Sequence, residues 1–329
     1  MESIKDRVHY HIYADIPSSD SRMWDDIKPV LISPGKTTDI ENRIAKKDAQ
    51  SINTYHELIV GKSFLGFSQS FGYKLEYESN SLFNSNKTPD WTISSENETV
   101  LIEVATKHNS NLTLIKQAFI GLIADRFNNV AINYTHFVLP YFNKEKPDYD
   151  DLQQHCDDLF RRIDDCIGSL SKDNFNTACV DGLTITLGST PQTNCLVGST
   201  PTRYLLSIAE KAEKYKQLSQ NYPLIIAIVS KNLIRCGGIS PKMMAELLYG
   251  TIGDYHPEQF NICECDYQKL EVMRPSINKI AGILFCDMHN YNQGALSYEY
   301  YPNPHKVTTG KIYSELLTYL KGQSGETQK

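Results

Sequence analysis

The stretch of sequence that decides the fold is PDWTISSENETVLIEVATK, residues 89–107. Residues 91–93 and 99–105 are rich in apolar and β-branched side chains and enclose a polar turn, so they predict two neighbouring antiparallel strands. Asp90 stands where the first strand begins, and Glu103 lies inside the second. Adjacent antiparallel strands place residues opposite one another, so this pattern can bring the two carboxylates together at one edge of a sheet.

The surroundings of Glu103 point to a metal site. It lies in the apolar run 100–105, where a carboxylate is costly unless it is paired or metal-bound. Carboxylate oxygens suit Mg²⁺, which needs only one or two protein carboxylates because it keeps several waters. Such an ion can neutralise phosphate charge and lower the pKa of a bound water. The ordinary alternative makes Asp90 a turn residue and Glu103 a surface charge at a strand edge.

Upstream of this stretch the pattern is helical. Thr38 and Glu41 have the spacing of a capping box, and the helical region that they open runs to about residue 71, with a break near residues 50–53. Gly72 ends it. Residues 74–78 predict a strand, and residues 8–14 (VHYHIYA) predict a short strand within an N-terminal extension, residues 1–37.

Downstream the sequence alternates between helices and strands. The apolar run LIIAIV, residues 224–229, is typical of a strand buried on both faces. The remaining segments are predicted as helices at 112–127, 150–170, 203–220, 241–249 and 311–321, and as strands at 131–140, 179–187, 280–286 and 295–301. Together they predict a single α/β domain over residues 38–321, with a mixed central sheet flanked by helices, extra elements in the C-terminal half, and a disordered tail at 322–329.

The order of these residues resembles the PD-(D/E)xK superfamily of restriction-endonuclease-like nucleases over about residues 53–127. Pro89-Asp90 matches the PD of that family, Glu103 matches its D/E, and Glu57 matches a glutamate often supplied by the first helix. The family lysine should stand two residues after the acid, where this chain has Ala105. The substitutes considered are Lys107 first and Lys116 second, and Gln117 fits a glutamine that some members carry on the next helix.

The resemblance implies a Mg²⁺-dependent endonuclease, with Mn²⁺ as an alternative ion. Asp90 and Glu103 would be metal ligands, Glu57 an auxiliary ligand or water-orienting group, and Lys107 the cation that polarises the water. Alternation along a strand puts Glu103, Ala105 and Lys107 on one face, with Lys107 about 13 Å from Glu103 if the strand is regular. The implied substrate is DNA in preference to RNA, and the implied context is bacterial or antiviral defence, with a homodimer or a defence-system protein as further partner.

Charge and composition limit the classes of protein that this sequence can belong to. The net charge of −6 argues against a protein coated in basic surface, although a local basic groove stays compatible with it. The sequence has no run of 18 apolar residues and no signal peptide, so it predicts a cytoplasmic protein with no membrane segment and with reduced cysteines. Lys211 and Lys214 fit a solvated helix face better than a phosphate-binding groove.

Two other functions remain open at this point. A catalytically degenerate module would keep the fold, bind nucleic acid or a partner protein, and lack cleavage because the lysine is missing. A small-molecule hydrolase on an unrelated α/β fold would hold Asp90 and Glu103 too far apart to share an ion.

Overall fold

The computed structural model describes fourteen stretches of the chain: residues 3–13, 22–31, 34–46, 49–79, 88–106, 111–134, 136–139, 148–173, 176–187, 201–230, 239–251, 262, 264–288 and 297–324. These residues form two compact units. Unit 1 comprises Met1–Asp15 and Asn109–Gly198, and unit 2 comprises Ile16–His108 and Ser199–Lys329. The sequence predicted one domain from residue 38 to 321, whereas in this division a 90-residue segment of unit 1 interrupts unit 2.

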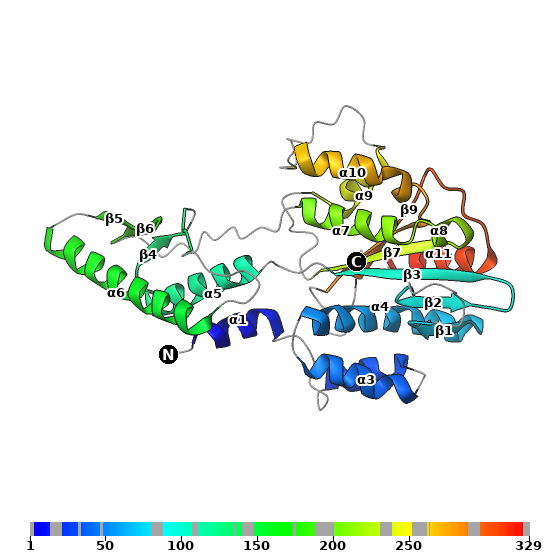
Figure 1. Ribbon diagram of the computed structural model, residues 1–329, viewed down its shortest axis with the longest axis horizontal. Coiled ribbons are helices and arrows are strands. Elements are labelled where there is room, and N and C mark those ends of the chain that lie inside the picture. The colour runs from blue at the N-terminus through cyan, green and yellow to red at the C-terminus, as the bar shows by residue number, and fades with distance from the viewer. Residues whose placement is uncertain are drawn as a thin grey trace. The chain divides into compact units, whose positions relative to one another are not determined.

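A mixed six-stranded sheet organises unit 2 (Figure 1). Its order is β1-β2-β3-β7-β8-β9, in which β3, β7 and β8 are parallel and the outer pairs are antiparallel. The strands are β1 (Lys74–Tyr77), β2 (Trp91–Ser94), β3 (Thr99–Thr106), β7 (Leu224–Ser230), β8 (Gly282–Asp287) and β9 (Ser297–Pro302). Every residue of β7 and β8 is buried, which explains the apolar runs that predicted them.

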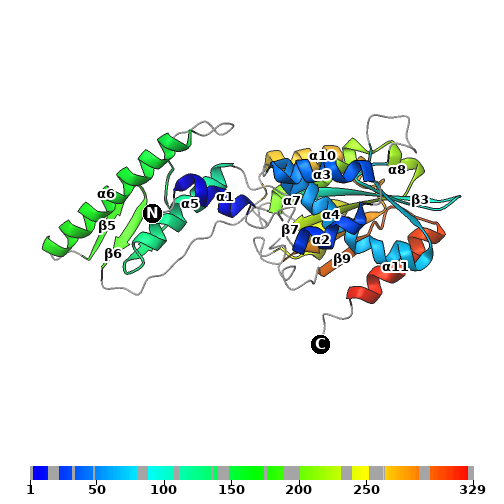
Figure 2. The same cartoon turned by 90° about the horizontal axis from the view of Figure 1, so that it is seen from below.

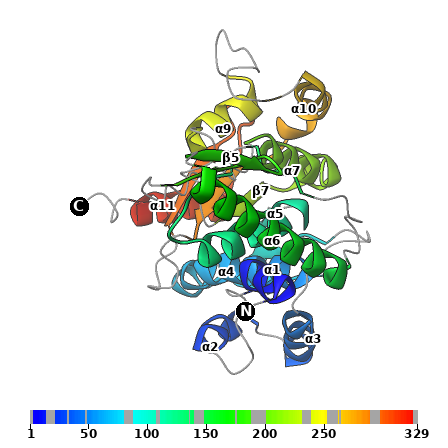
Figure 3. The same ribbon diagram turned by 90° about the vertical axis from the view of Figure 1, so that its left-hand side faces the viewer.

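Helices cover both faces of this sheet. The long helix α4 (Ala49–Phe71) packs against β1 and β3, and α7 (Pro201–Lys214) packs against β3 and β7 from the other side (Figures 1 and 3). Helices α9 (Pro241–Tyr249) and α10 (Glu264–Ile277) pack on α7, and α11 (Lys311–Ser324) packs on β9. The smaller elements are α2 (Arg22–Ile27), η1 (Lys28–Val30), α3 (Pro34–Ala45) and α8 (Leu218–Asn221). The predicted class, an α/β protein with a helix-flanked mixed sheet, is confirmed.

Unit 1 has its own apolar core. It contains α1 (Ile4–Tyr13), α5 (Asn111–Arg126), α6 (Tyr149–Asp173) and a three-stranded antiparallel sheet beside α6 (Figure 2). The sheet order is β4 (Ala131–Asn133), β6 (Leu183–Thr186) and β5 (Thr177–Val180). None of the helices in the described parts of the chain is long and apolar enough to cross a membrane, in agreement with the sequence.

The strand predicted for residues 8–14 was wrong, because helix α1 covers this segment up to Tyr13. Ile4 and Val8 lie one helical turn apart, and both are buried in the contact with α5 and α6. The alternation in VHYHIYA is therefore incidental, and the apolar face follows the helical period.

The single strand predicted for residues 179–187 was also wrong. The segment is a hairpin of β5 and β6 whose turn is Asp181-Gly182. Both turn residues have a positive φ, 47° and 78°, as a two-residue hairpin turn of the Asp-Gly type requires.

The strand predicted for residues 131–140 is much shorter, because only Ala131–Asn133 form β4 and residues 136–139 are not in a strand. Other boundaries moved by a few residues. The helical region expected from Thr38 is two helices, α3 and α4, which break before Ala49 instead of near residues 50–53. Helix α3 begins at Pro34, so Thr38 lies inside the helix and is not its cap. Gly72 ends α4 with a φ of 71°, as predicted. The helix expected at 203–220 is divided into α7 and α8, and α10 was not predicted. Of the expected tail, residues 322–324 belong to α11, and the remainder lies outside the described residues.

Candidate functional site

The structure brings Asp90 and Glu103 together. Trp91 pairs with Ile102 in the β2–β3 ladder, so Asp90 and Glu103 are the next residues along the two strands. The Asp90 N–H donates to Glu103 Oε2 over 3.3 Å, and the Val104 N–H donates to Asp90 Oδ2 over 2.6 Å. Each carboxylate is thus held by the backbone beside the other. Asp90 and Glu103 are therefore not widely separated, as they would be in a small-molecule hydrolase on an unrelated fold.

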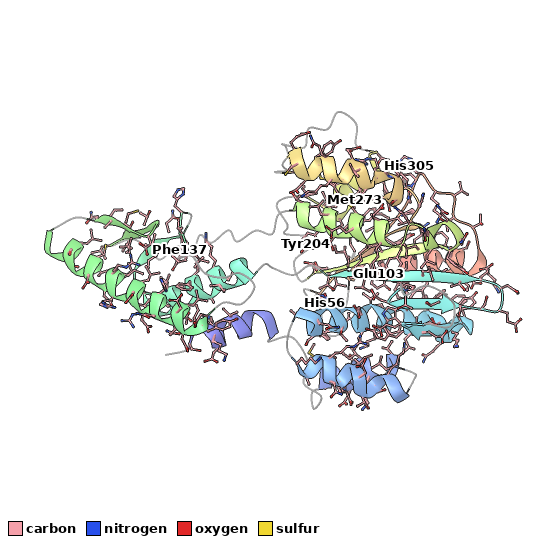
Figure 4. The ribbon with its side chains drawn as sticks, viewed as in Figure 1. His56, Glu103, Phe137, Tyr204, Met273 and His305 are labelled. Atoms are coloured by element: carbon pink, nitrogen blue, oxygen red, sulfur yellow. The ribbon has the colours of Figure 1, made fainter. Side chains whose placement is uncertain are left out.

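Glu103 is fully buried, with 0% of its surface exposed. Figure 4 labels Glu103 on β3. Alternation along this strand places it on the same face as Leu101 and Ala105, which pack in the core formed with α7. A carboxylate at this depth needs compensating charge or hydrogen bonds. Glu103 is therefore not an exposed charge at a strand edge, which was the alternative to a metal site.

Two lysines of α7 supply that charge. Lys211 Nζ lies 2.5 Å from Glu103 Oε1, and Lys214 Nζ lies 3.4 Å from the same oxygen. The sequence predicted that both lysines lie on a solvent-exposed face of the helix. This prediction was wrong for Lys211 and only partly right for Lys214, whose side chain is 44% exposed but also contacts Glu103. A signal was present in the sequence: Ile208, Ala212 and Tyr215 surround Lys211 at helical spacing and are all buried, so Lys211 stands within the apolar stripe.

The predicted substitute lysines have different outcomes. Ala105, at the place of the family lysine, is fully buried. Lys107 lies outside the described residues, so its role stays a prediction. Lys116 belongs to α5 of unit 1, where its ammonium donates to the Phe137 carbonyl over 2.8 Å. Gln117 follows it on the same helix. Sequence reasoning therefore missed Lys211, the lysine that the structure places on Glu103.

Glu57 is fixed at the same site by its helix. The indole N–H of Trp91 donates to the Glu57 carbonyl over 2.7 Å, and the Tyr77 hydroxyl donates to Glu57 Oε2. One turn further along α4, the absence of a side chain at Gly61 leaves room for the Trp91 ring, since a Cβ there would lie 2.1 Å from Trp91 Cζ2. The charge of Glu57 acts on Asp90 and that of Glu103 acts on Glu57, so the three carboxylates lie within electrostatic range of one another.

The electrostatics of the cluster reflect an excess of negative charge. Burial raises the pKa of Asp90 well above its usual value, the charges of Glu103 and Glu57 raise it further, and Lys211 and the Val104 N–H act in the opposite direction. Burial also raises the pKa of Glu57, partly offset by the hydrogen bond from Tyr77. Burial alone would lower the pKa of Lys211, but Glu103 and Asp90 outweigh it and the net shift is upward. Three carboxylates thus face two ammonium groups.

Tyr215, the residue after the end of α7, connects that helix to the segment that leads through Asp90 into β2. Its hydroxyl donates to the Thr88 carbonyl over 2.8 Å, two residues before Asp90. The Lys214 ammonium lies 4.5 Å from the centre of the Tyr215 ring, within the range of a cation–π interaction. Tyr215 is buried, so this tie between α7 and the segment entering β2 is shielded from water.

The donor set fits a hard divalent cation held partly by water. Within the described ranges there is no group of three or more His, Cys, Asp or Glu side chains that could hold a metal ion by themselves. Asp90 and Glu103 instead offer two carboxylates, which is sufficient for Mg²⁺ and unsuited to a structural zinc ion. Asp90 and Glu57 are only partly buried, so solvent reaches the edge of the cluster.

No protein-family model, no curated protein and no solved structure matches this chain. The resemblance to the PD-(D/E)xK superfamily therefore stays a prediction from the sequence.

Proposed function

We propose that unit 2 is a Mg²⁺-dependent phosphodiesterase of the restriction-endonuclease type that cleaves nucleic acid, with DNA as the favoured substrate. The observation that carries this proposal is the cluster formed by Asp90 and Glu103 on adjacent strands with Lys211 at 2.5 Å from Glu103. Paired carboxylates with a half-buried lysine are a set of groups that can support metal-assisted phosphodiester hydrolysis.

Each residue has a chemical role in this proposal. Asp90 and Glu103 would hold the ion, which when bound neutralises phosphate charge and acidifies a coordinated water. Lys211 replaces the lysine missing at Ala105: it orients the attacking water and stabilises negative charge on the phosphate. Glu57, held by Tyr77, orients a water or serves as an auxiliary ligand. Lys107 remains the second candidate for the role of Lys211, and Mn²⁺ the second candidate ion.

The wider context is proposed from the family resemblance. A nuclease of this type fits a defence or restriction role in a bacterial cell, with a second copy of the chain or a defence-system protein as partner. The net charge of −6 predicts that nucleic acid binds locally at the lysines of the site, and not over the whole surface.

The direct test is a cleavage assay on the full chain. Supercoiled, linear and single-stranded DNA and RNA are incubated with Mg²⁺, Mn²⁺ or EDTA, using the wild type and the variants Asp90→Asn and Glu103→Gln. We expect each variant to lose on the order of a hundredfold or more of the activity. Glu96→Gln is the matched control, because Glu96 lies exposed in the turn between the same two strands. Activity that survives Glu103→Gln would overturn the proposed site.

Ala105 supports a second candidate, a degenerate nuclease fold that binds nucleic acid or a partner protein without cleaving it. This residue is fully buried where the family has its lysine. In that case the wild type would retain nucleic acid in a binding assay, with neither cleavage nor cation binding under any of the same conditions.

A further inference from the structure

The two lysines that share Glu103 Oε1 are not equivalent. Lys211 makes the shorter contact, 2.5 Å, and its side chain is 29% exposed. Lys214 makes a contact of 3.4 Å, at the long limit of a hydrogen bond, and its side chain is 44% exposed. Lys214 is also the last residue of α7. Of the two, Lys214 therefore makes the longer contact with the carboxylate and has the more exposed side chain.

Lys214 has a second surface to lie against. Its ammonium is 4.5 Å from the centre of the Tyr215 ring, and Tyr215 is itself fixed by its hydrogen bond to the Thr88 carbonyl. A lysine carries its charge on a flexible four-carbon stem, so it can exchange partners without a backbone movement. The ring and Glu103 contact the ammonium at the same time, so the ring keeps a favourable contact with it while its ionic partner changes.

A divalent cation and Lys214 compete for the same carboxylate. An ion bound to Asp90 and Glu103 brings two positive charges to a group that Lys211 and Lys214 already neutralise. Repulsion between like charges then favours displacement of the ammonium whose contact with Glu103 is longer and whose side chain is more exposed, which is that of Lys214.

We propose that Lys214 neutralises Glu103 while the site holds no divalent ion, and that ion binding displaces its ammonium toward the substrate phosphate. This inference rests on the proposed function and assigns a second catalytic lysine to it. Lys211 stays on Glu103 next to the attacking water, and Lys214 contacts a phosphate oxygen from the exposed side of the site. The displacement breaks and forms ionic contacts only.

The test measures cation affinity and cleavage on the same variants of the full chain. Mn²⁺ and Mg²⁺ are titrated calorimetrically into the wild type, Lys214→Met and Lys216→Met at 0.15 M salt. Lys216 is the matched control, since it is the same charge two residues away and pairs with Glu213. We expect Lys214→Met to bind the ion about threefold to tenfold more tightly, because the competing charge is gone, and Lys216→Met to change affinity by less than about twofold.

Cleavage by Lys214→Met should move in the opposite direction and fall by about tenfold or more at saturating ion. Tighter ion binding combined with slower cleavage supports the inference, because a merely structural role would lower both. Unchanged or weaker ion binding in Lys214→Met, with its thermal unfolding unaltered, overturns the inference and leaves the proposed function standing. A wild type that binds neither ion overturns the proposed function, and the inference with it.

Discussion

At the scale of single residues, the site depends on a buried excess of carboxylates. Glu103 was identified from the sequence because an acid within an apolar strand is expensive unless it has a partner, and Asp90 because it stands at the start of the neighbouring strand. Lys211 was not identified, because its ion pair joins residues 108 positions apart, and no local pattern records such a contact. Its place in the apolar stripe of α7 indicated burial, but not the partner.

Asp90 predicts a specific dependence of stability on pH. Burial and the charges of Glu103 and Glu57 raise its pKa above the ordinary value of 3.8. The folded protein therefore keeps a proton that the unfolded chain has already released, so the free energy of unfolding falls as the pH rises through the raised pKa. Mg²⁺ should oppose this loss. We expect the increase in melting temperature caused by Mg²⁺ to grow with pH, and a pH-independent increase would contradict the account.

Asp90→Asn tests the same excess charge by substitution. The amide oxygen can still accept the hydrogen bond of the Val104 N–H, while the negative charge is gone. We expect the metal-free variant to be more stable than the wild type by about 1 kcal/mol above neutral pH, at the cost of function. Its melting temperature should no longer respond to Mg²⁺. Chemical unfolding with and without the ion measures both effects, and a destabilised variant that still responds to Mg²⁺ is the opposite outcome.

At the scale of elements, the sequence was informative where apolar runs have clear ends. The β2–β3 pair, β7 and α9 were predicted closely, because Pro, Gly or a polar turn bounds each of them. The prediction failed where two periods are compatible with the sequence: residues 8–14 alternate like a strand, while Ile4 and Val8 lie at helical spacing. At Asp181-Gly182 a hairpin signal was present in the sequence but was not used.

The contact between α4 and β2 predicts the effect of one added methyl group. A Cβ at Gly61 would lie 2.1 Å from the Trp91 ring, so Gly61→Ala forces the helix away from the strand that Asp90 precedes. We expect a loss of about 1–3 kcal/mol in the free energy of unfolding, together with reduced cleavage. Gly168→Ala in α6 is the control: a Cβ there meets nothing within 4 Å, and the variant should gain up to about 1 kcal/mol. Equal effects of the two substitutions on urea unfolding would refute this view of the contact.

The hydrogen bond of Tyr215 links α7 to the segment that positions Asp90 before β2, so we expect α7 to control the geometry of this segment. Tyr215→Phe removes the hydrogen bond to the Thr88 carbonyl and should cost about 1 kcal/mol of stability. It should also weaken Mn²⁺ binding several-fold, because the segment that positions Asp90 is less restrained.

Tyr249→Phe is a control for that substitution. Its hydroxyl makes the same kind of bond, 2.9 Å to the Tyr301 carbonyl. A similar loss of stability with unchanged Mn²⁺ affinity is expected. If Tyr249→Phe lowered the Mn²⁺ affinity as much as Tyr215→Phe does, Tyr215 would have no special connection to the site.

At the scale of the whole molecule, local sequence patterns predicted the α/β fold class but not the division of the chain into two compact units. The mixed sheet follows from the order of strands and helices. The division into two units follows from long-range contacts, such as those of α1 with α5, which join segments about a hundred residues apart. All of the residues assigned to the site from the structure belong to unit 2, although α7 and β3 are separated in sequence by the long segment of unit 1.

The central claim is that Asp90 and Glu103 together bind a divalent cation. The most direct measurement is a calorimetric titration of Mn²⁺ into the wild type, Glu103→Gln and the exposed control Glu96→Gln. We predict saturable binding at one site in the wild type and in Glu96→Gln, and its loss in Glu103→Gln. No binding by the wild type, or equal binding by all three proteins, would contradict it.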